Sequence, residues 1–311
     1  MNLPFSNAAY YEQVLLPREA GGHGLDFLHY VDNSASAISD YPFVLTLHDT
    51  MHTRPLSDVR PGATFRQRLV YNYKRWAIPR SAKRAKAVLT VSDYSKNRIV
   101  WKMGIPEERI FVTPEGVDLK LFRAVKRKPM KLFKILVHGA ADERKNIPNI
   151  LKAAKLLVKQ GKVFQMVIIG MDENELKCTN YIEQVIDMGL GSQVEWAGNV
   201  PPWTLNQVYA DVDLFLYPSL MEGFGLPVLE AFACGVPVIA SDTTSLPEVA
   251  GNAALLVDPK SPEAIAKAIQ QMMKSKSLRK LYVQRGLRRA KQFTWEKTAK
   301  MTLKVYESLE F

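Results

Sequence analysis

Short apolar runs alternate with longer stretches of helical spacing along most of the chain. Apolar runs of about four to eight residues, bounded by polar or turn-forming residues, are typical of strands buried in a parallel sheet. Parallel strands need crossover connections, which the helical stretches can supply. The pattern therefore predicts an α/β protein in which helices cover both faces of parallel sheets.

The alternation falls into two series. In the first, strands are expected at residues 26–31, 43–48, 87–92 and 109–114, and helices at 8–18, 63–82 and 93–103. In the second, strands are expected at residues 131–139, 164–170, 193–198, 213–219, 237–241 and 253–258. Helices should fill most gaps of the second series, including 146–160, 174–189 and 227–234, and the tail from Pro262 should be helical with a break near Phe293 and Thr294.

The segment between the two series, residues 125–131, reads VKRKPMK. It is charged, contains a proline and has no apolar periodicity, so it is a candidate linker. We expect two doubly wound, Rossmann-like domains facing a cleft, with ligand at the carboxyl ends of the strands. The expected boundaries are 1–128 for the first domain and 129–293 for the second, with a C-terminal helix, 294–311, packing back toward the first.

Composition narrows the class of protein. The 311 residues are 47% hydrophobic and 23% charged, which is ordinary for a globular protein with room for two cores. No apolar run reaches the roughly 18 residues that a membrane span needs, and the N-terminal segment lacks the pattern of a secretory signal. Cys178 and Cys234 have no metal-ligand spacing, so we expect free thiols and a cytoplasmic location.

The net charge of +11 is concentrated in one region. Residues 54–128 contain 19 Lys and Arg against 6 Asp and Glu. Such a surface favours anionic lipid, nucleic acid or phosphorylated substrates, although a solvated face of several helices is the alternative. Because no zinc-finger, helix-turn-helix or RNA-binding motif accompanies the charge, we expect no nucleic-acid partner.

The stretch MEGFGLPVLEAFACGVPVIASD, residues 221–242, carries the most chemistry. Pro227 suits the first turn of a helix and Gly235 suits its left-handed stop. Such a helix would direct its unpaired N–H groups and positive dipole end toward Gly223, Phe224, Gly225 and Leu226. Glycines there allow a ligand to approach the backbone, so the segment predicts an anion site for phosphate or diphosphate.

Two glutamates, Glu222 and Glu230, flank this predicted anion site. Carboxylate oxygens accept hydrogen bonds from hydroxyl groups, so the pair could hold two parts of an elongated ligand such as a nucleoside diphosphate sugar. The alternative is a surface glutamate and a helix-capping glutamate. A glycosidase would place both carboxylates about 5 to 9 Å apart around one bond and has no use for a phosphate-binding helix end.

The segment EGFGLPVLEA, followed by PVIAS, PEV and AALLVDP, resembles the E-x7-E donor-site signature of the retaining GT-B glycosyltransferases of family 4. The segments VTPEGVDLKLF, TVSDYSKNRI and FTWEKTAKMTLKVYES are similar to three further segments of that family, and the resemblance runs from about Tyr10 to the end. It implies a GT-B fold and sugar transfer from a nucleotide-diphosphate sugar, with retention of configuration and without a metal or other cofactor.

The resemblance also implies roles for individual residues. Glu222 would hold hydroxyls of the donor sugar, Glu230 would hold the ribose, and the amides of Gly225 and Leu226 would meet the distal phosphate. Lys145, in HGAADERKNI, matches the lysine that neutralises the diphosphate as the nucleotide leaves.

The same segment differs from many relatives at one position. Arg144 adjoins Lys145 in a loop that follows Gly139, and many relatives have arginine where this chain has Ala140. Leaving-group stabilisation would therefore depend on Arg144, Lys145 and the helix end.

Three further positions follow from the resemblance. His48, at a strand end of the first domain, matches a histidine that reaches the donor sugar, although a single strand-end histidine is more often structural. The nucleotide base would meet backbone atoms around residues 195–201, including Val200, which leaves UDP, GDP and ADP undistinguished. Glu115 stands where many relatives have asparagine. The implied mechanism is a front-face displacement in which the departing phosphate helps deprotonate the acceptor, so no catalytic base is assigned.

Relatives usually begin with a strand and a glycine-rich turn upstream of the first segment recognised here, so we expect the N-terminal domain to be truncated. Its exposed sheet edge would then be covered by a second copy or by an anionic membrane. The expected acceptor is lipid-linked or a polysaccharide, at the inner face of the cell membrane. The alternative is a non-catalytic or partner-dependent accessory subunit that binds nucleotide sugars.

Overall fold

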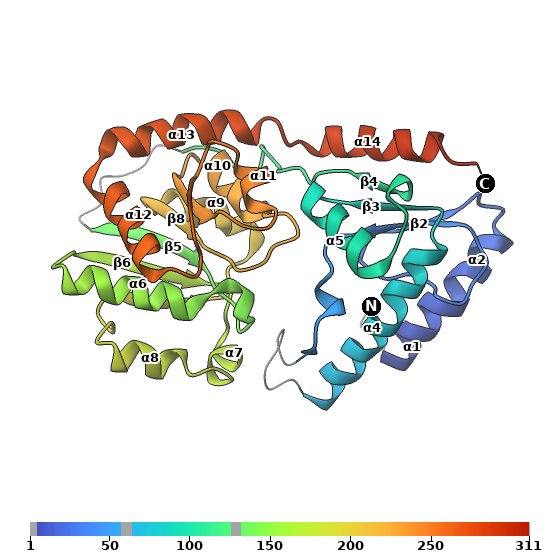
Figure 1. Ribbon diagram of the computed structural model, residues 1–311, viewed down its shortest axis with the longest axis horizontal. Coiled ribbons are helices and arrows are strands. Elements are labelled where there is room, and N and C mark those ends of the chain that lie inside the picture. Colours follow the sequence, from blue (N-terminus) through green and yellow to red (C-terminus); the bar gives the residue numbers. More distant parts are fainter. Residues whose placement is uncertain (1–4, 57–63, 126–131, 311) are drawn as a thin grey trace. The chain divides into compact units, whose positions relative to one another are not determined.

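The computed structural model describes residues 5–56, 64–125 and 132–310 (Figure 1). Internal contacts divide the chain into a first unit, Met1–Pro114 with Glu296–Phe311, and a second unit, Glu115–Trp295. The expected boundary at 128/129, and all of the expected linker except Val125, lie outside the described residues. Residues 115–125 belong to the second unit by their contacts, whereas the sequence pattern predicts them in the first domain.

The first unit contains a four-stranded parallel sheet in the order β1-β2-β3-β4. Its strands are β1 (Leu28–Tyr30), β2 (Phe43–Leu47), β3 (Ala87–Thr90) and β4 (Ile110–Val112). Its helices are α1 (Phe5–Tyr10), a π-helical turn (Tyr11–Leu15), α2 (Leu16–Gly22), α4 (Phe65–Arg84), α5 (Asp93–Met103) and most of α14 (Trp295–Glu307).

Successive side chains along each strand point to opposite faces of the sheet, and helices cover both faces. On one face, Phe43 and Leu45 of β2 pack in a cluster with Ile78 of α4 and Ile99 of α5. On the other face, Val44 packs with Ala87, Leu89 and Val305 of the C-terminal helix α14. The two central strands, β2 and β3, therefore bury both of their faces, which explains why they read as nearly continuous apolar runs.

The second unit contains a six-stranded parallel sheet in the order β10-β9-β8-β5-β6-β7. Its strands are β5 (Phe133–His138), β6 (Phe164–Ile169), β7 (Val194–Gly198), β8 (Leu214–Tyr217), β9 (Val238–Ser241) and β10 (Leu255–Val257). Its helices are α6 (Ile147–Lys159), α7 (Glu173–Lys177), α8 (Tyr181–Asp187), α9 (Pro202–Ala210), α10 (Leu226–Ala233), α11 (Leu246–Ala250), α12 (Pro262–Lys274) and α13 (Lys276–Ala290).

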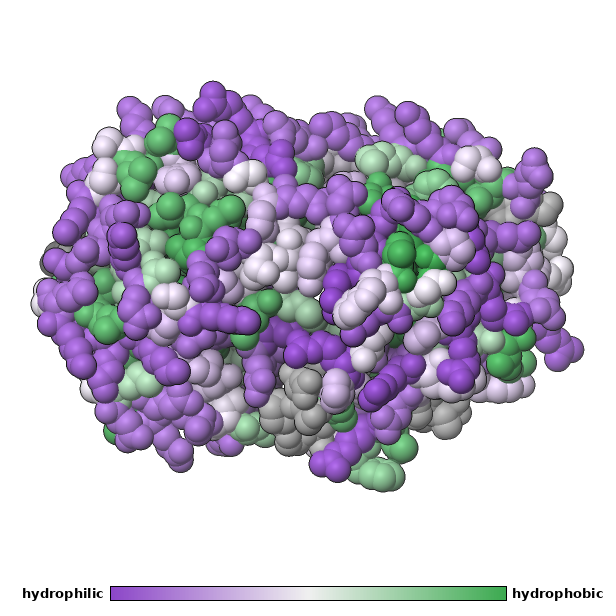
Figure 2. All heavy atoms as spheres, viewed as in Figure 1, coloured by the Kyte–Doolittle hydropathy of each residue, from purple (hydrophilic) through white to green (hydrophobic). Residues whose placement is uncertain are grey.

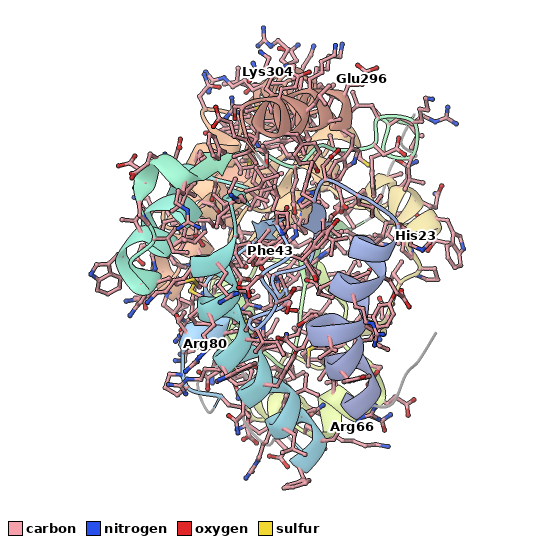
Figure 3. All side chains as sticks on the ribbon, turned by 90° about the vertical axis from the view of Figure 1, so that its right-hand side faces the viewer. His23, Phe43, Arg66, Arg80, Glu296 and Lys304 are labelled. Carbon is pink, nitrogen blue, oxygen red and sulfur yellow. The ribbon has the colours of Figure 1, made fainter. Side chains whose placement is uncertain are left out.

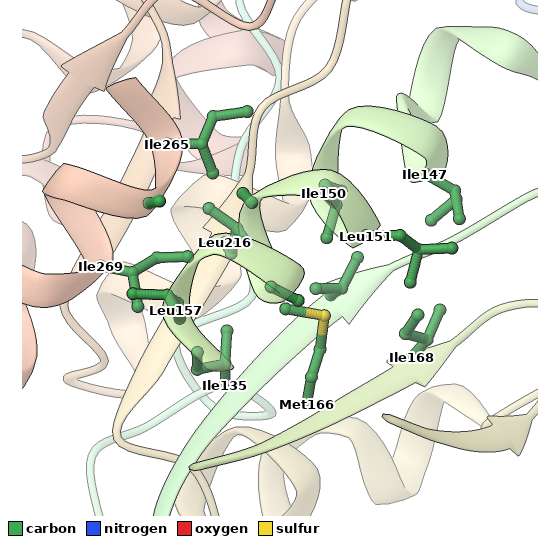
Figure 4. Close-up of a cluster of buried hydrophobic side chains, with 14 of the residues drawn as sticks. Ile135, Ile147, Ile150, Leu151, Leu157, Met166, Ile168, Leu216, Ile265 and Ile269 are labelled. Atoms are coloured by element: carbon green, nitrogen blue, oxygen red, sulfur yellow. The ribbon is translucent and has the colours of Figure 1, made fainter. Parts of the chain in front are cut away.

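The main core of the second unit lies between its sheet and helices α6 and α12 (Figure 4). Ile135 of β5, Leu151 of α6 and Ile269 of α12 are among its fully buried members. Helices α10 and α13 pack closely against each other elsewhere in the unit. A Cβ on Gly286 of α13 would lie 2.7 Å from Cδ1 of Phe232, so glycine is needed there.

Strand order fixes where a ligand is expected in this sheet. The chain proceeds from β5 outward to β6 and β7, and then returns to the other side of β5 to form β8, β9 and β10. The topological switch point therefore lies between β5 and β8. In open parallel sheets, ligands bind outside the carboxyl ends of the strands at this point.

The structure contains a strand within each of the ten ranges predicted from the pattern. The prediction of one helix over 174–189 was wrong, because α7 and α8 are separate there. Thr179 Oγ1 bonds to the carbonyl of Leu176 at 2.9 Å, and the amide of Tyr181 lies 3.4 Å from the same hydroxyl. This side chain competes with the helical backbone and ends α7.

Two of the compositional predictions concern features that the structure describes. Neither Cys178 nor Cys234 takes part in a disulfide among the described residues, as predicted. Of the helices in the described ranges, none has the length and apolar character needed to cross a bilayer.

Candidate functional site

The carboxyl ends of β5 and β8 carry two aromatic residues, His138 and Tyr217, which are the last residues of their strands. Gly139 follows β5 directly, and its amide donates to the carbonyl of Ile169 at 2.8 Å. A Cβ at Gly139 would lie 2.7 Å from Cγ2 of Ile168. Close packing against β6 therefore requires glycine here and directs the following loop past the sheet edge.

That loop ends in a short 3-10 helix, Glu143–Lys145, which places two basic side chains. Asp142 caps it by accepting from the amide of Arg144 at 2.9 Å, and its other oxygen pairs with Arg144 Nε at 2.8 Å. Asn146 is left-handed, with φ of 61°, and its Nδ2 donates to the carbonyls of Pro218 and Pro259. These bonds fasten the loop to the segments that follow β8 and β10.

Lys145, Tyr217 and Glu222 form a hydrogen-bonded triad. Lys145 Nζ lies 2.6 Å from the Tyr217 hydroxyl and 2.8 Å from Glu222 Oε1. The Tyr217 hydroxyl donates to the same oxygen at 2.7 Å. Among the described residues, Glu222 Oε2 accepts no hydrogen bond from a protein side chain or amide. One carboxylate oxygen is thus held by the protein and the other is available to a ligand.

The triad sets the charge state of its members. Burial alone would raise the pKa of Glu222, but the charge and hydrogen bond of Lys145, the hydroxyl of Tyr217 and the charge of Arg144 together outweigh it, and the pKa is lowered. Burial would lower the pKa of Lys145, but Tyr217 and Glu222 outweigh it and the pKa is raised. Burial, with Glu222 adding to it, raises the pKa of Tyr217. At neutral pH the triad is therefore an ammonium, a neutral phenol and a carboxylate.

Glu230 lies in α10 and is buried. The hydroxyl of Tyr209 donates to its Oε2 at 3.0 Å, and burial raises the pKa of its carboxyl group. The Tyr209 hydroxyl also lies 3.4 Å from His138 Nε2. The same hydroxyl lies 3.3 Å from the carbonyl of Pro227, so Tyr209 contacts both β5 and α10.

A ladder of rings connects the two glutamates. His138 stacks on Tyr209 with centroids 6.1 Å apart and meets Tyr217 edge-on at 6.4 Å. Burial, reinforced by the charge of Lys145, lowers the pKa of His138 to about 3, so the ring is neutral at physiological pH. Glu222 and Glu230 therefore stand at two ends of one connected arrangement, each with its own tyrosine.

The glycine-rich loop meets the start of α10 between the two glutamates. Gly225 has φ of 122°, and a Cβ there would lie 2.6 Å from Cδ2 of Leu246. The buried hydroxyl of Ser245 lies 2.7 Å from the carbonyl of Phe224 and 3.0 Å from that of Glu222. In the described part of the chain, neither Gly225 nor Leu226 donates its amide to a protein acceptor. These amides and the helix dipole suit an anion.

The structure brings most of the predicted site residues into the second unit. Gly139, Arg144, Lys145 and the segment 222–230 lie in or beside the carboxyl edge of β5 and β8. Val200 lies in the half-buried loop after β7. His48 belongs to the first unit, where its Nε2 lies 3.0 Å from the carbonyl of Val31. The site residues that contact one another all belong to the second unit. The role of His48 at the donor site stays a prediction.

Sequence reasoning missed Tyr217, Tyr209, His138 and Ser245. Tyr217 and His138 end apolar strands directly before site loops, a position that the sequence shows. Tyr209 lies in α9 and Ser245 lies before α11, so only packing reveals their contacts. Within the ranges that the structure describes, no three His, Cys, Asp or Glu side chains gather closely enough to hold a metal ion.

Two family models match the chain, one over each part. The family described as glycosyl transferases group 1 matches residues 119–289, and glycosyltransferase family 4 matches residues 3–121. The O-antigen chain mannosyltransferase B of Escherichia coli is 34% identical over 76% of this chain and 64% of its own length. The MMP alpha-(1->4)-mannosyltransferase of Mycolicibacterium hassiacum is 30% identical over 86% of this chain and 65% of its own length. The chain thus spans slightly less than two thirds of these relatives.

Solved structures support the fold. Sucrose-phosphate synthase from Thermosynechococcus elongatus matches 94% of this chain and 75% of its own, with a TM-score of 0.77 and 22% identity. HepE of Anabaena in complex with UDP-glucose matches 99% of this chain and 85% of its own, with a TM-score of 0.75 and 19% identity. The predicted fold class of two Rossmann-like domains is confirmed, while a truncated first domain stays a prediction. The chain belongs to the glycosyl transferases group 1 family.

Proposed function

We propose that the protein transfers a sugar from a nucleotide-diphosphate-sugar donor to a lipid-linked or polysaccharide acceptor. The observation that carries this proposal is the Lys145–Tyr217–Glu222 triad beside the free amides that begin α10. A cation, two amides and a helix dipole suit a diphosphate, and the open oxygen of Glu222 suits a sugar hydroxyl. The family relationship supports the same chemistry.

In this proposal, Glu230 holds the ribose through the oxygen that Tyr209 does not occupy. The two ends of the ring ladder then bind the two ends of the donor, with the diphosphate between them. Lys145 would exchange part of its contact with Glu222 for phosphate oxygens, so that its charge is used where negative charge develops on the leaving group. Arg144 contributes less, because Asp142 already pairs with its Nε.

Several finer points belong to the proposal as well. We propose retention of anomeric configuration and activity without a metal ion, both tested directly by proton NMR of the first product and by assay in excess EDTA. The uridine, guanosine and adenosine donors are all candidates, since the loop around Val200 would meet the base through backbone atoms. A cytoplasmic site of action, at the inner face of the membrane, and a homo-oligomer formed through the first unit are further parts of this hypothesis.

The decisive experiment compares two single variants, Glu222→Ala and Lys145→Ala, with the unmodified protein. We expect each to lower transfer and nucleotide-sugar hydrolysis by about a thousandfold, because preorganised charge near the leaving group contributes several kcal/mol. Matched controls are Glu183→Ala and Lys152→Ala, which remove exposed charges from α8 and α6 of the same unit. Circular dichroism checks that all four variants fold.

Activity that survives in both site variants would exclude the proposed reaction at this site. Calorimetric titration with UDP, GDP, ADP and their glucose or mannose conjugates separates binding from turnover. Tight binding without turnover in the unmodified chain, restored by a co-purified second protein, would instead favour the accessory subunit.

A further inference from the structure

Helix α4 of the first unit has an unusual charge distribution. Its sequence, FRQRLVYNYKRWAIPRSAKR, contains seven Lys and Arg residues and no Asp or Glu. It begins with a capping box between Thr64 and Gln67 and continues for 20 residues. A helix of this length with one sign of charge produces a strong local positive potential.

The two faces of α4 differ in burial. Its buried residues are Tyr71, Ala77, Ile78, Ser81 and Ala82, which pack toward the sheet. On the opposite face, Phe65 is 77% exposed, Leu69 44% and Trp76 39%. At about 3.6 residues per turn, these three side chains project within ~40° of one another, so they form one apolar stripe. The stripe faces away from the core that the rest of the helix helps to build.

Basic side chains flank this stripe on both sides. By helical position, Arg68 and Arg75 lie along one side, and Arg66 and Arg80 lie along the other. The guanidinium of Arg80 lies over the ring of Trp76, 5.3 Å from its centroid. Helix α4 runs across the side of the first unit that faces the viewer in Figure 3, where Arg66 and Arg80 are labelled.

Charge alone does not distinguish α4, because α13 is also basic and lacks acidic residues. Two arginines of α13 bond to backbone carbonyls, Arg285 to that of Asn252 and Arg289 to those of Glu248 and Val249. Its exposed large apolar side chain is Leu281, at 38%. The face of the molecule drawn in Figure 2 is mainly polar, and its apolar side chains are scattered. The combination of a basic helix with an aligned apolar stripe is what marks α4.

We infer that the outer face of α4 docks on an anionic lipid bilayer, with Phe65, Leu69 and Trp76 inserted among the acyl chains. Long basic side chains beside an apolar stripe can reach lipid phosphates while their stems stay in the interface. An in-plane amphipathic helix binds through both contributions. The inference rests on the proposed function only for its purpose, which is to bring the enzyme to a lipid-linked acceptor.

A second copy of the chain is a poorer occupant of the same face. In a two-fold symmetric dimer the same patch meets itself, so the arginines that flank the stripe would face their own copies. Like charges brought together in this way oppose association. A lipid surface offers negative charge and an apolar interior together.

The test is sedimentation of the full chain with vesicles of phosphatidylcholine, with and without about 30% phosphatidylglycerol. Binding is expected only to the anionic vesicles. The variant Arg66→Gln, Arg75→Gln, Lys83→Gln should lower the partition coefficient roughly a hundredfold at low salt, since each basic residue near an anionic surface contributes about fivefold. The variant Phe65→Ser, Leu69→Ser should lower it about tenfold.

Matched controls lie in the second unit. Lys276→Gln, Lys280→Gln, Arg288→Gln removes three exposed charges from α13, and Val163→Ser, Ile186→Ser removes two side chains that are each 68% exposed. Neither control should change vesicle binding by more than about twofold. Circular dichroism and nucleotide titration of every variant separate loss of lipid binding from loss of folding or of the donor site.

Three outcomes would overturn the inference. The first is absence of binding to anionic vesicles by the unmodified chain. The second is an equal loss from the α13 control. The third is binding that depends on the α4 charges but not on Phe65 and Leu69 and that a single-stranded RNA displaces, which would identify a general polyanion surface. None of these outcomes bears on the donor site, which the transfer assay tests separately.

Discussion

At the scale of single residues, the site depends on two hydrogen bonds that end on the same carboxylate oxygen. Glu222 Oε1 accepts from both Lys145 and Tyr217, so one oxygen is fully used and the other stays open. The two glutamates were predicted because their spacing around a glycine-rich helix start has a chemical meaning, and Lys145 was predicted from the resemblance to the family. Tyr217 was not, because a tyrosine at the end of an apolar run looks like core.

Tyr217 should therefore act as a positioning residue. We expect Tyr217→Phe to lower kcat about ten- to a hundredfold, because hydrogen bonds to charged groups contribute about 1.5 to 3 kcal/mol. KM for the donor should change less than threefold, since the amides and the lysine remain. Steady-state kinetics measures both constants.

The matched control for Tyr217→Phe is Tyr181→Phe, a buried tyrosine in α8 whose ring stacks on Trp196. Its kinetic constants should stay within twofold of those of the unmodified protein. An unchanged kcat in Tyr217→Phe would show that Glu222 and Lys145 keep their positions without the hydroxyl of Tyr217.

His138 provides a prediction about pH. Its pKa is about 3 in the folded protein, lowered mainly by burial, against 6.5 as its ordinary value. The unfolded chain therefore binds a proton near pH 6.5 that the folded chain refuses, so stability falls as pH decreases from about 6.5 toward 3. At pH 5 this loss amounts to roughly 1 to 2 kcal/mol, since one pKa unit corresponds to about 1.4 kcal/mol.

The variant His138→Phe keeps an aromatic ring and removes the titration. Its unfolding free energy, measured with urea, should depend less on pH between 7 and 5 than that of the unmodified protein. Carboxyl groups titrate in both proteins, so the difference between the two curves is the relevant quantity. Parallel curves would mean that the imidazole gains its proton freely in the folded state.

At the scale of elements, the start of α10 determines where the anion site lies. Pro227 and the stop after Cys234 predicted this helix within one residue of its observed bounds, Leu226–Ala233. Helix ends with strong local signals were predictable in this way, as for α5 between Ser92 and Gly104. The break between α7 and α8 was not predicted, because a threonine side chain competes with the backbone there without a glycine or proline to announce it.

Gly225 should not tolerate a side chain. Its φ of 122° is unfavourable for alanine, and a Cβ would lie 2.6 Å from Leu246. We expect Gly225→Ala to lower the unfolding free energy by about 1 to 3 kcal/mol and to weaken nucleotide binding. Gly161→Ala is the control, because Gly161 also has positive φ, at 67°, but open space around it. Equal effects of the two substitutions would show that contact with Leu246 has no part.

At the scale of the whole molecule, two cores with separate sheets predict two unfolding transitions. Leu45 lies in the core of the first unit and Leu151 in that of the second. In scanning calorimetry, Leu45→Ala and Leu151→Ala should each lower mainly one transition, because large-to-small core substitutions cost about 2 to 5 kcal/mol. A nucleoside diphosphate should raise the transition that Leu151→Ala lowers, since a ligand stabilises the unit that binds it.

A single transition that shifts in both variants would mean that the two units unfold together. A nucleotide that raises only the transition sensitive to Leu45→Ala would place the donor site in the first unit and would contradict the assignment of Lys145 and Glu222.

By itself the sequence determined the ten strands, the two-domain plan and the donor-site segment. Buried parallel strands need continuous apolar runs, and a helix start that receives an anion needs glycine, proline and acidic residues in a fixed local order. The tertiary structure decided which distant side chains complete the site. Strand order brings His138 and Lys145, at and after the end of β5, to Tyr217 and Glu222, because β5 and β8 become neighbours although some 75 residues separate them. Tyr209 of α9 reaches Glu230 of α10 through helix packing. The spacing of residues in the sequence does not predict that β5 and β8 are adjacent, because their adjacency results from packing of the whole sheet.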